Sequence, residues 1–146
     1  MIAYLDASAL VKRYVVERGS RETIALTAES EMIATSIVTR AEVAAALAKA
    51  ARTGLVTENL ARGAQRSFAG DWQDLVRVPV TEALVQRAEA LAWDHGLRGY
   101  DAVQLASALT WQESVGAEIL LATFDQQLWE AAPKTGVRAW PEKFSR

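Results

Sequence analysis

Four acidic residues stand where the surrounding sequence predicts burial, and together they suggest a metal site. Asp6 and Asp125 come directly after apolar runs that are typical of buried strands. Glu42 and Asp101 lie in otherwise apolar helical stretches. A buried carboxylate is costly unless it is paired, protonated or bound to a metal. Four carboxylates that converge at one edge of a sheet would suit Mg²⁺ or Mn²⁺ and phosphodiester chemistry.

The two strand-end acids have a simpler alternative, because aspartate is a common N-cap residue for a helix that follows a strand. Asp6 and Asp125 both precede helical patterns, so each fits this role. Their strands are also the strongest candidates for the centre of the sheet, and open α/β sheets bind ligands at the carboxyl ends of their strands. Capping and a functional site both remain open for this pair.

The two helical acids also have structural alternatives. Glu42 has small, mostly apolar neighbours three and four positions away, but it can also be a partly exposed residue paired with Arg40 or Lys49. Asp101 can be a first-turn residue that is favoured by the helix dipole and paired with Arg98. The case for a site therefore depends on all four acids together.

The elements that must position these acids alternate between strands and helices, as in a parallel α/β sheet. We expect strands near residues 2–6, 32–35, 76–80, 118–123 and 137–140. We expect helices near residues 8–17, 20–28, from 36 or 39 to 54, 57–72, 81–96, 101–114 and 126–132. Ser8 is expected to cap the first helix, and Pro79 favours an edge or a strand end for the third strand.

The composition indicates one globular domain over residues 1–146, with 51% hydrophobic and 23% charged residues. The chain has no cysteine, which excludes disulfides and thiolate chemistry and is compatible with a reducing cytoplasm. We see no signal peptide and no membrane span, so we expect a cytoplasmic protein. The net charge of −2 does not exclude a nucleic-acid substrate, because two bound divalent ions would make the protein positive.

Several other residues have structural interpretations. The single histidine, His95, is expected at a helix end, and one histidine is too few for a zinc histidine cluster. The five tryptophans favour packing over base stacking. The cations near the acids in the sequence can contact a substrate phosphate or simply be exposed or paired, and both readings stay open for Lys12, Arg13, Arg40 and Arg98.

The contexts of the four acids resemble those of the PIN-domain family and, within it, of the VapC-type toxins. The resemblance covers essentially the whole chain, and its motifs occur in the family's order. Its most specific stretch is residues 97–106, Leu-Arg-Gly-Tyr-Asp-Ala-Val-Gln-Leu-Ala. The other matching stretches are residues 4–12, 40–43 and 122–128.

By this resemblance, the acids that form the metal site are Asp6, Glu42, Asp101 and Asp125. Ser8 and Thr123 would be hydroxyls that support a ligand or water. The chain departs from many such toxins at Gln104, where they place a histidine. The family fold is a short parallel β-sheet flanked by helices.

The resemblance also implies a function. We expect a Mg²⁺- or Mn²⁺-dependent endoribonuclease toxin that hydrolyses RNA and is inhibited by a small antitoxin, and we expect a homodimer. The first alternative is a catalytically weak PIN-like module that binds RNA or protein. The second is a phosphatase or phosphoacceptor domain, although Ser8 stands where such domains need a second aspartate.

Overall fold

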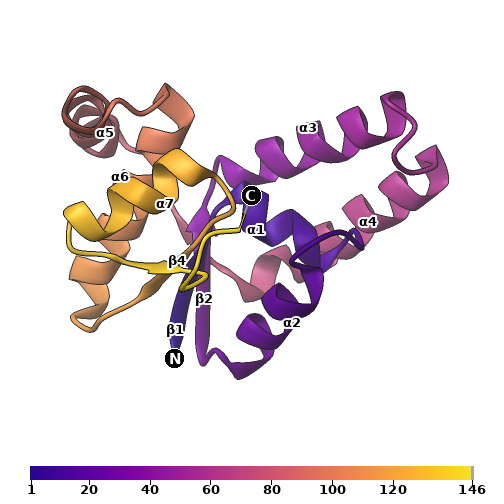
Figure 1. Cartoon of the computed structure of the whole chain (residues 1–146), viewed down its shortest axis with the longest axis horizontal. Helices are drawn as coiled ribbons and strands as arrows, with labels where there is room; N and C mark the ends of the chain where they lie inside the picture. The colour runs from indigo at the N-terminus through magenta and orange to yellow at the C-terminus, as the bar shows by residue number, and fades with distance from the viewer. Residues whose placement is uncertain (146) are drawn as a thin grey trace.

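A computed structural model describes residues 1–145, and its centre is a five-stranded parallel sheet (Figure 1). The strand order is β3-β2-β1-β4-β5, and every neighbouring pair is parallel. The strands are β1 (Ile2–Leu5), β2 (Met32–Ser36), β3 (Val76–Val78), β4 (Leu120–Ala122) and β5 (Arg138–Trp140). Because the central strands are covered on both faces, they are continuous apolar runs rather than alternating ones.

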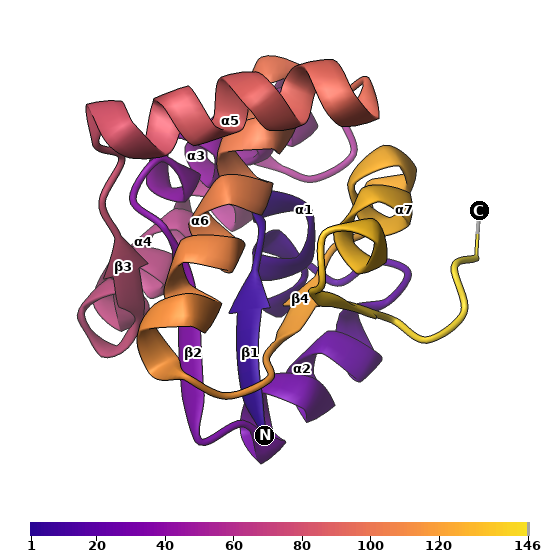
Figure 2. The ribbon, with the colours of Figure 1, turned by 90° about the vertical axis from the view of Figure 1, so that its left-hand side faces the viewer.

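Helices cover both faces of the sheet (Figures 1 and 2). The helices are α1 (Ala7–Leu10), α2 (Ser20–Glu29), α3 (Thr39–Arg52), α4 (Glu58–Asp71), α5 (Glu82–His95), α6 (Gly99–Val115) and α7 (Gln126–Lys134), with 3₁₀ turns η1 (Val11–Arg13) and η2 (Trp72–Asp74). Helices α5, α6 and α7 lie on one side, and α1 to α4 lie on the other. The pair α3 and α4 extends beyond the sheet (Figure 1).

Each face of the sheet has its own hydrophobic core. Successive residues of a strand point to opposite faces, so Tyr4 packs in the core under α5, α6 and α7, while Leu5 packs in the core under α1 to α4. Leu105 of α6 is fully buried in the first core, and Phe68 of α4 is almost fully buried in the second. The two cores hold β1 rigidly at the centre, and the strand delivers Asp6 to the end of the sheet.

The expected elements are confirmed to within a few residues, with one clear difference. Ser8 does not cap the first helix: Asp6 is its N-cap, and the helix is a short α1 followed by the turn η1. Asp6 is the cap because its carboxylate accepts a hydrogen bond from the N–H of Ala9 at 3.0 Å, whereas the hydroxyl of Ser8 donates to Asp6. The bulky and β-branched stretch 14–16 then disfavours a longer helix.

Local sequence signals also account for the ends of other elements. Thr57 and Thr81 cap α4 and α5, and Gly96 ends α5 in the left-handed region with a φ of 63°. Strand β3 is an edge strand that ends before Pro79. The single domain predicted for residues 1–146 includes one residue, Arg146, that lies outside the described part of the chain. None of the helices within residues 1–145 has the length and hydrophobicity needed to cross a membrane.

Candidate active site

Asp6 and Asp125 lie side by side at the carboxyl end of the sheet, because their strands β1 and β4 are hydrogen-bonded neighbours. The N–H of Asp6 continues the ladder by donating to the carbonyl of Ala122 at 3.2 Å. Both aspartates are also N-caps, since Asp6 accepts from Ala9 and Asp125 accepts from the N–H of Leu128, each at 3.0 Å. Capping therefore accompanies their position at the edge where such sheets bind ligands.

Two hydroxyl groups hold the carboxylate of Asp6, which is only 4% exposed. Ser8 Oγ donates to Oδ1 at 2.7 Å, and Thr123 Oγ1 donates to Oδ2 at 2.6 Å. The same hydroxyls accept backbone N–H groups of the neighbouring loop, from Phe124 at 2.9 Å and from Asp125 at 3.1 Å. Ser8 and Thr123 thus join the end of β1 to the end of β4 around Asp6.

The pKa of Asp6 is raised to about 6, mainly because the carboxyl group is buried. The hydrogen bonds from Thr123, Ser8 and Ala9 act in the opposite direction, since they favour the charged form. The negative charge of Asp101 adds to the increase. Asp6 therefore lies in an environment that would favour a nearby cation.

Arg98 bridges the third and fourth acids. It is the N-cap residue of α6, and its Nη2 lies 2.8 Å from Oδ2 of Asp125 while its Nε lies 3.2 Å from Oδ2 of Asp101. Asp101 is 4% exposed, and burial raises its pKa. The charge of Asp125 raises the pKa of Asp101 further, and Arg98 lowers it. The first-turn position of Asp101 and its pairing with Arg98 are thus both present.

Glu42 reaches the same region from the first turn of α3, where it is half-buried. Its Oε1 accepts a hydrogen bond of 2.7 Å from Nε2 of Gln104 on α6. The partner is therefore Gln104 rather than Arg40, whose guanidinium lies 5.6 Å from the ring centre of Trp72. Burial raises the pKa of Glu42, the hydrogen bond from Gln104 lowers it, and the charge of Asp101 raises it.

Asp101 is electrostatically coupled to each of the other three predicted acids. Its charge raises the pKa of Asp6 and of Glu42, and the charge of Asp125 raises the pKa of Asp101. Within residues 1–145, no group of three or more histidine, cysteine or acidic side chains is arranged closely enough to hold a metal ion. Binding an ion would require these side chains to move closer together.

The chemistry of the donor set fits a hard divalent cation. Its members offer carboxylate oxygens, which Mg²⁺ and Mn²⁺ prefer, and the set contains no sulfur or imidazole ligand. Three of the acids have raised pKa values because burial and mutual repulsion disfavour their charged forms. A cation would relieve both effects, as the guanidinium of Arg98 does in part between Asp101 and Asp125.

The buried polar network behind Glu42 is not predicted from the sequence. In the sequence, Gln104 is notable only as a departure from the family pattern, and Tyr4 belongs to an apolar strand. Gln104 is 1% exposed, and its Oε1 accepts from the hydroxyl of Tyr4 at 2.5 Å. The available signal was a glutamine one helical turn after Asp101 in an otherwise apolar stretch of helix.

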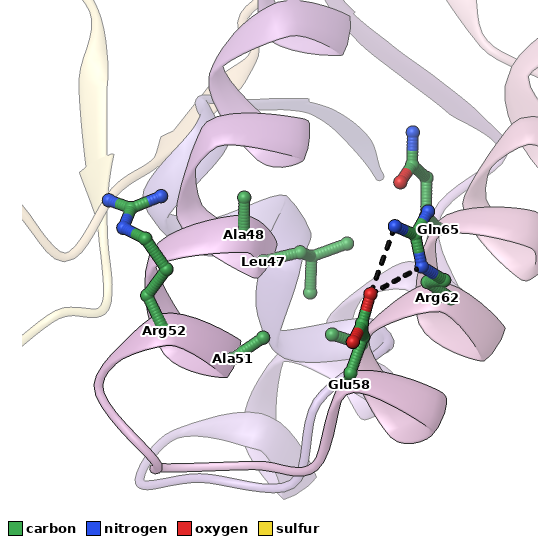
Figure 3. Close-up of a pocket in the computed structure, with 8 residues that line it drawn as sticks. Leu47, Ala48, Ala51, Arg52, Glu58, Arg62 and Gln65 are labelled. Atoms are coloured by element: carbon green, nitrogen blue, oxygen red, sulfur yellow. Dashed lines mark hydrogen bonds and ion pairs between the residues drawn. The ribbon is translucent and has the colours of Figure 1, made fainter.

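A separate hollow lies between α3 and α4, away from the four acids (Figure 3). Its volume is about 350 Å³, and its apolar wall comes from Leu47, Ala48 and Ala51 of α3 (Figure 3). Glu58 and Arg62 form an ion pair of 3.0 Å on the α4 side. The lining of the hollow is partly apolar and partly charged, and none of the four acids belongs to it.

Comparisons with known proteins agree with this architecture. The model of the PIN domain family matches residues 3–134. Ribonuclease VapC49 of Mycobacterium tuberculosis (strain ATCC 25618 / H37Rv) is 38% identical over 141 residues, which cover 96% of this chain and 95% of the relative. Ribonuclease VapC3 of Pyrobaculum aerophilum is 32% identical over 131 residues, covering 88% of this chain and 93% of the relative.

Solved structures share the fold at lower sequence identity. A toxin–antitoxin complex from Klebsiella pneumoniae contains a chain with a TM-score of 0.69 and 17% identity, covering 98% of this chain and 99% of that one. PAE2754 from Pyrobaculum aerophilum has a TM-score of 0.65 and 25% identity, covering 94% of this chain and 83% of that one. Because the PIN domain model matches most of the chain and the VapC relatives are up to 38% identical to it, the chain belongs to the PIN domain family.

Proposed function

We propose that this protein is a metal-dependent endoribonuclease and the toxin of a type II toxin–antitoxin pair. The observation that carries the proposal is that Asp6 and Asp125 follow neighbouring strands, with Asp101 joined to Asp125 through Arg98. It is supported by the 38% identity to proteins named Ribonuclease VapC. The acids that would hold Mg²⁺ or Mn²⁺ are Asp6, Glu42, Asp101 and Asp125. The chemistry supplied by such an ion would be activation of a water molecule and stabilisation of the departing oxygen of a phosphodiester.

The other residues of the site would orient these acids. Ser8 and Thr123 hold both oxygens of Asp6, which limits the directions from which that carboxylate can meet a ligand. Arg98 has an exposed guanidinium between Asp101 and Asp125, and it would be the cation that contacts an RNA phosphate beside these acids. Hydrolysis by in-line attack of water would leave a 5′-phosphate and a 3′-hydroxyl.

We infer a small antitoxin as the partner, because one solved structure of the same fold is a toxin–antitoxin complex from Klebsiella pneumoniae. The hollow between α3 and α4 is a docking groove for an amphipathic segment of that antitoxin. A second part of the antitoxin would inhibit the enzyme by placing a cationic side chain among the acids. The contact of Arg98 with Asp101 and Asp125 is an internal example of such a pairing.

The catalytic proposal is tested by cleavage of a mixed pool of tRNA, rRNA and mRNA with Mg²⁺, Mn²⁺ or EDTA. We expect cleavage with either ion and none with EDTA. Asp6→Ala and Asp101→Ala should abolish cleavage while the proteins remain folded, and the exposed Asp94→Ala is the matched control that should remain active. Cleavage that persists in EDTA or in Asp101→Ala would contradict the proposal, and metal-dependent RNA binding without cleavage would favour the binding-module alternative.

The assembly is tested separately. We propose a homodimer in the cytoplasm, and light scattering at micromolar concentration should give twice the mass of one chain. The affinity for the antitoxin should fall as the divalent ion concentration rises, because ion and inhibitor would compete for the same carboxylates. A monomer in light scattering would refute the dimer, and an antitoxin complex with the acids still accessible to Mn²⁺ would refute this mode of inhibition.

A further inference from the structure

A buried polar network connects Glu42 to the centre of the fold. Gln104 is its middle member: Nε2 donates to Oε1 of Glu42 at 2.7 Å and to Oγ1 of Thr39 at 2.9 Å, while Oε1 accepts from the hydroxyl of Tyr4 at 2.5 Å. Thr39 also accepts from Thr35 at 2.8 Å. The network thus joins α6, α3, β1 and β2 at one point beneath the acids.

The chemistry of the partners fixes the orientation of the Gln104 amide. An ionised carboxylate only accepts hydrogen bonds, so the NH₂ group of Gln104 must face Glu42. The amide oxygen then faces Tyr4, whose hydroxyl donates to it. With both amide hydrogens and the oxygen in use, Gln104 has one arrangement that satisfies all of its partners.

A buried glutamine amide destabilises the fold unless all of its hydrogen-bonding groups have partners. Gln104 is 1% exposed, yet it lies beside the fully buried Leu105 in the middle of the apolar face of α6. Within residues 1–145 no buried side-chain nitrogen or oxygen lacks a hydrogen-bond partner. A satisfied network of this kind holds its members in one geometry, and here the exposed end of the network is the Glu42 carboxylate.

We propose that Gln104 is a positioning residue that orients the carboxylate of Glu42 for binding a divalent cation. The inference rests on the proposed function, since it assigns Glu42 to the metal site. Ser8 and Thr123 hold Asp6 by hydrogen bonds, and Arg98 holds Asp101 and Asp125 by charge. Gln104 does for Glu42 what these groups do for the other acids, but from inside the core and without adding charge.

The test compares three variants by Mn²⁺ binding in calorimetry, Mn²⁺-dependent RNA cleavage and thermal unfolding. Gln104→Met keeps the length of the side chain and removes its hydrogen bonds. Gln104→His restores a donor for Glu42 and an acceptor for Tyr4. The control is Gln112→Met on the same helix, because Gln112 also uses both ends of its amide, toward Gly136 and Ile119, but lies away from the acids.

We expect Gln104→Met to bind Mn²⁺ about tenfold more weakly and to need about tenfold more Mn²⁺ for half-maximal cleavage, as is typical when a group that orients a ligand is removed. Saturating Mn²⁺ should restore most of the cleavage rate. Gln104→His should recover most of the affinity, and Gln112→Met should match the wild type. If Gln104→Met does not fold, Tyr4→Phe provides the measurement, with an expected loss of Mn²⁺ affinity smaller than tenfold.

The outcomes separate this inference from the proposed function. The positioning role is overturned if folded Gln104→Met binds Mn²⁺ as tightly as the wild type, and Tyr4→Phe decides in the same way where Gln104→Met does not fold. The ribonuclease proposal stays intact in that case. A wild-type protein that binds Mn²⁺ but cleaves no RNA overturns the ribonuclease proposal, while the Mn²⁺ affinities still decide the role of Gln104. A wild-type protein that binds no Mn²⁺ overturns both.

Discussion

Replacing Asp6 with asparagine should change the way in which stability depends on pH. Asparagine has nearly the same shape and remains neutral, so the variant removes the cost of burying a charge. The pKa of Asp6 is raised from its ordinary value of 3.8 to about 6. That difference corresponds to about 3 kcal/mol between the two protonation states.

The direction follows from proton binding. The folded protein holds the proton of Asp6 more tightly than the unfolded chain does, so this residue stabilises the fold fully below pH 3.8. The contribution is lost as the pH rises through about 6. The metal-free wild type should therefore lose stability relative to Asp6→Asn across this window, and the variant should be the more stable protein at pH 7.

Urea unfolding in EDTA at intervals from pH 4 to pH 8 measures the effect. We expect the unfolding free energy of Asp6→Asn, minus that of the wild type, to increase by about 2.4 kcal/mol over this range, because part of the full difference already lies below pH 4. Glu42 and Asp101, whose pKa values are also raised, remain in both proteins, so the difference reports Asp6 together with its coupling to Asp101. If the unfolding free energies of the two proteins change with pH in parallel, burial does not raise the pKa of Asp6. The electrostatic argument for a cation site would then lose its main support.

Three further outcomes are expected. A divalent ion at one hundred times its dissociation constant should raise the unfolding free energy of the wild type by about 2.7 kcal/mol in urea titrations, and no increase with Mg²⁺ or Mn²⁺ would speak against the site. Arg98→Ala should raise the pKa of Asp101, followed by carboxyl NMR, because the guanidinium lowers that pKa in the wild type. Gly19→Ala should lower the unfolding free energy by about 1–3 kcal/mol. Gly19 has a φ of 89°, and an added Cβ would lie 2.8 Å from the ring of Phe124. A urea unfolding curve identical to that of the wild type would refute this clash.

Much of the fold could be predicted from the sequence because local signals and global topology agree. The apolar runs before Asp6 and Asp125 became the neighbouring strands β1 and β4, and parallel strands place their carboxyl ends at one edge. The start of the first helix was less predictable. The sequence offers both Asp6 and Ser8 as its N-cap, because two residues with capping side chains stand two positions apart, and only the fold decides that Asp6 is the one that caps the helix.

The polar contacts around the acids were predictable only in part. The pair between Arg98 and Asp101 is local, three residues apart in one stretch, and it could be inferred from spacing. The bond from Gln104 to Glu42 joins residues 62 positions apart, and the bond from Thr123 to Asp6 joins residues 117 positions apart. Such contacts depend on how α6 packs against α3 and how β4 pairs with β1, which no local pattern encodes.

Capping does not exclude a role in the proposed site at the two strand-end aspartates, because the cap uses only one oxygen of each carboxylate. In Asp6, Oδ1 accepts from the N–H of Ala9, and in Asp125, Oδ1 accepts from the N–H of Leu128. The cap fixes the direction of each carboxylate, and the other oxygen, Oδ2, then meets Thr123 in one case and Arg98 in the other. An aspartate at the junction of a parallel strand and its helix is thus held by its cap through Oδ1, while Oδ2 contacts a group outside the helix. Capping is therefore compatible with the proposed cation site, and binding an ion there would have to exchange the Oδ2 contacts with Thr123 and Arg98 for contacts with the ion.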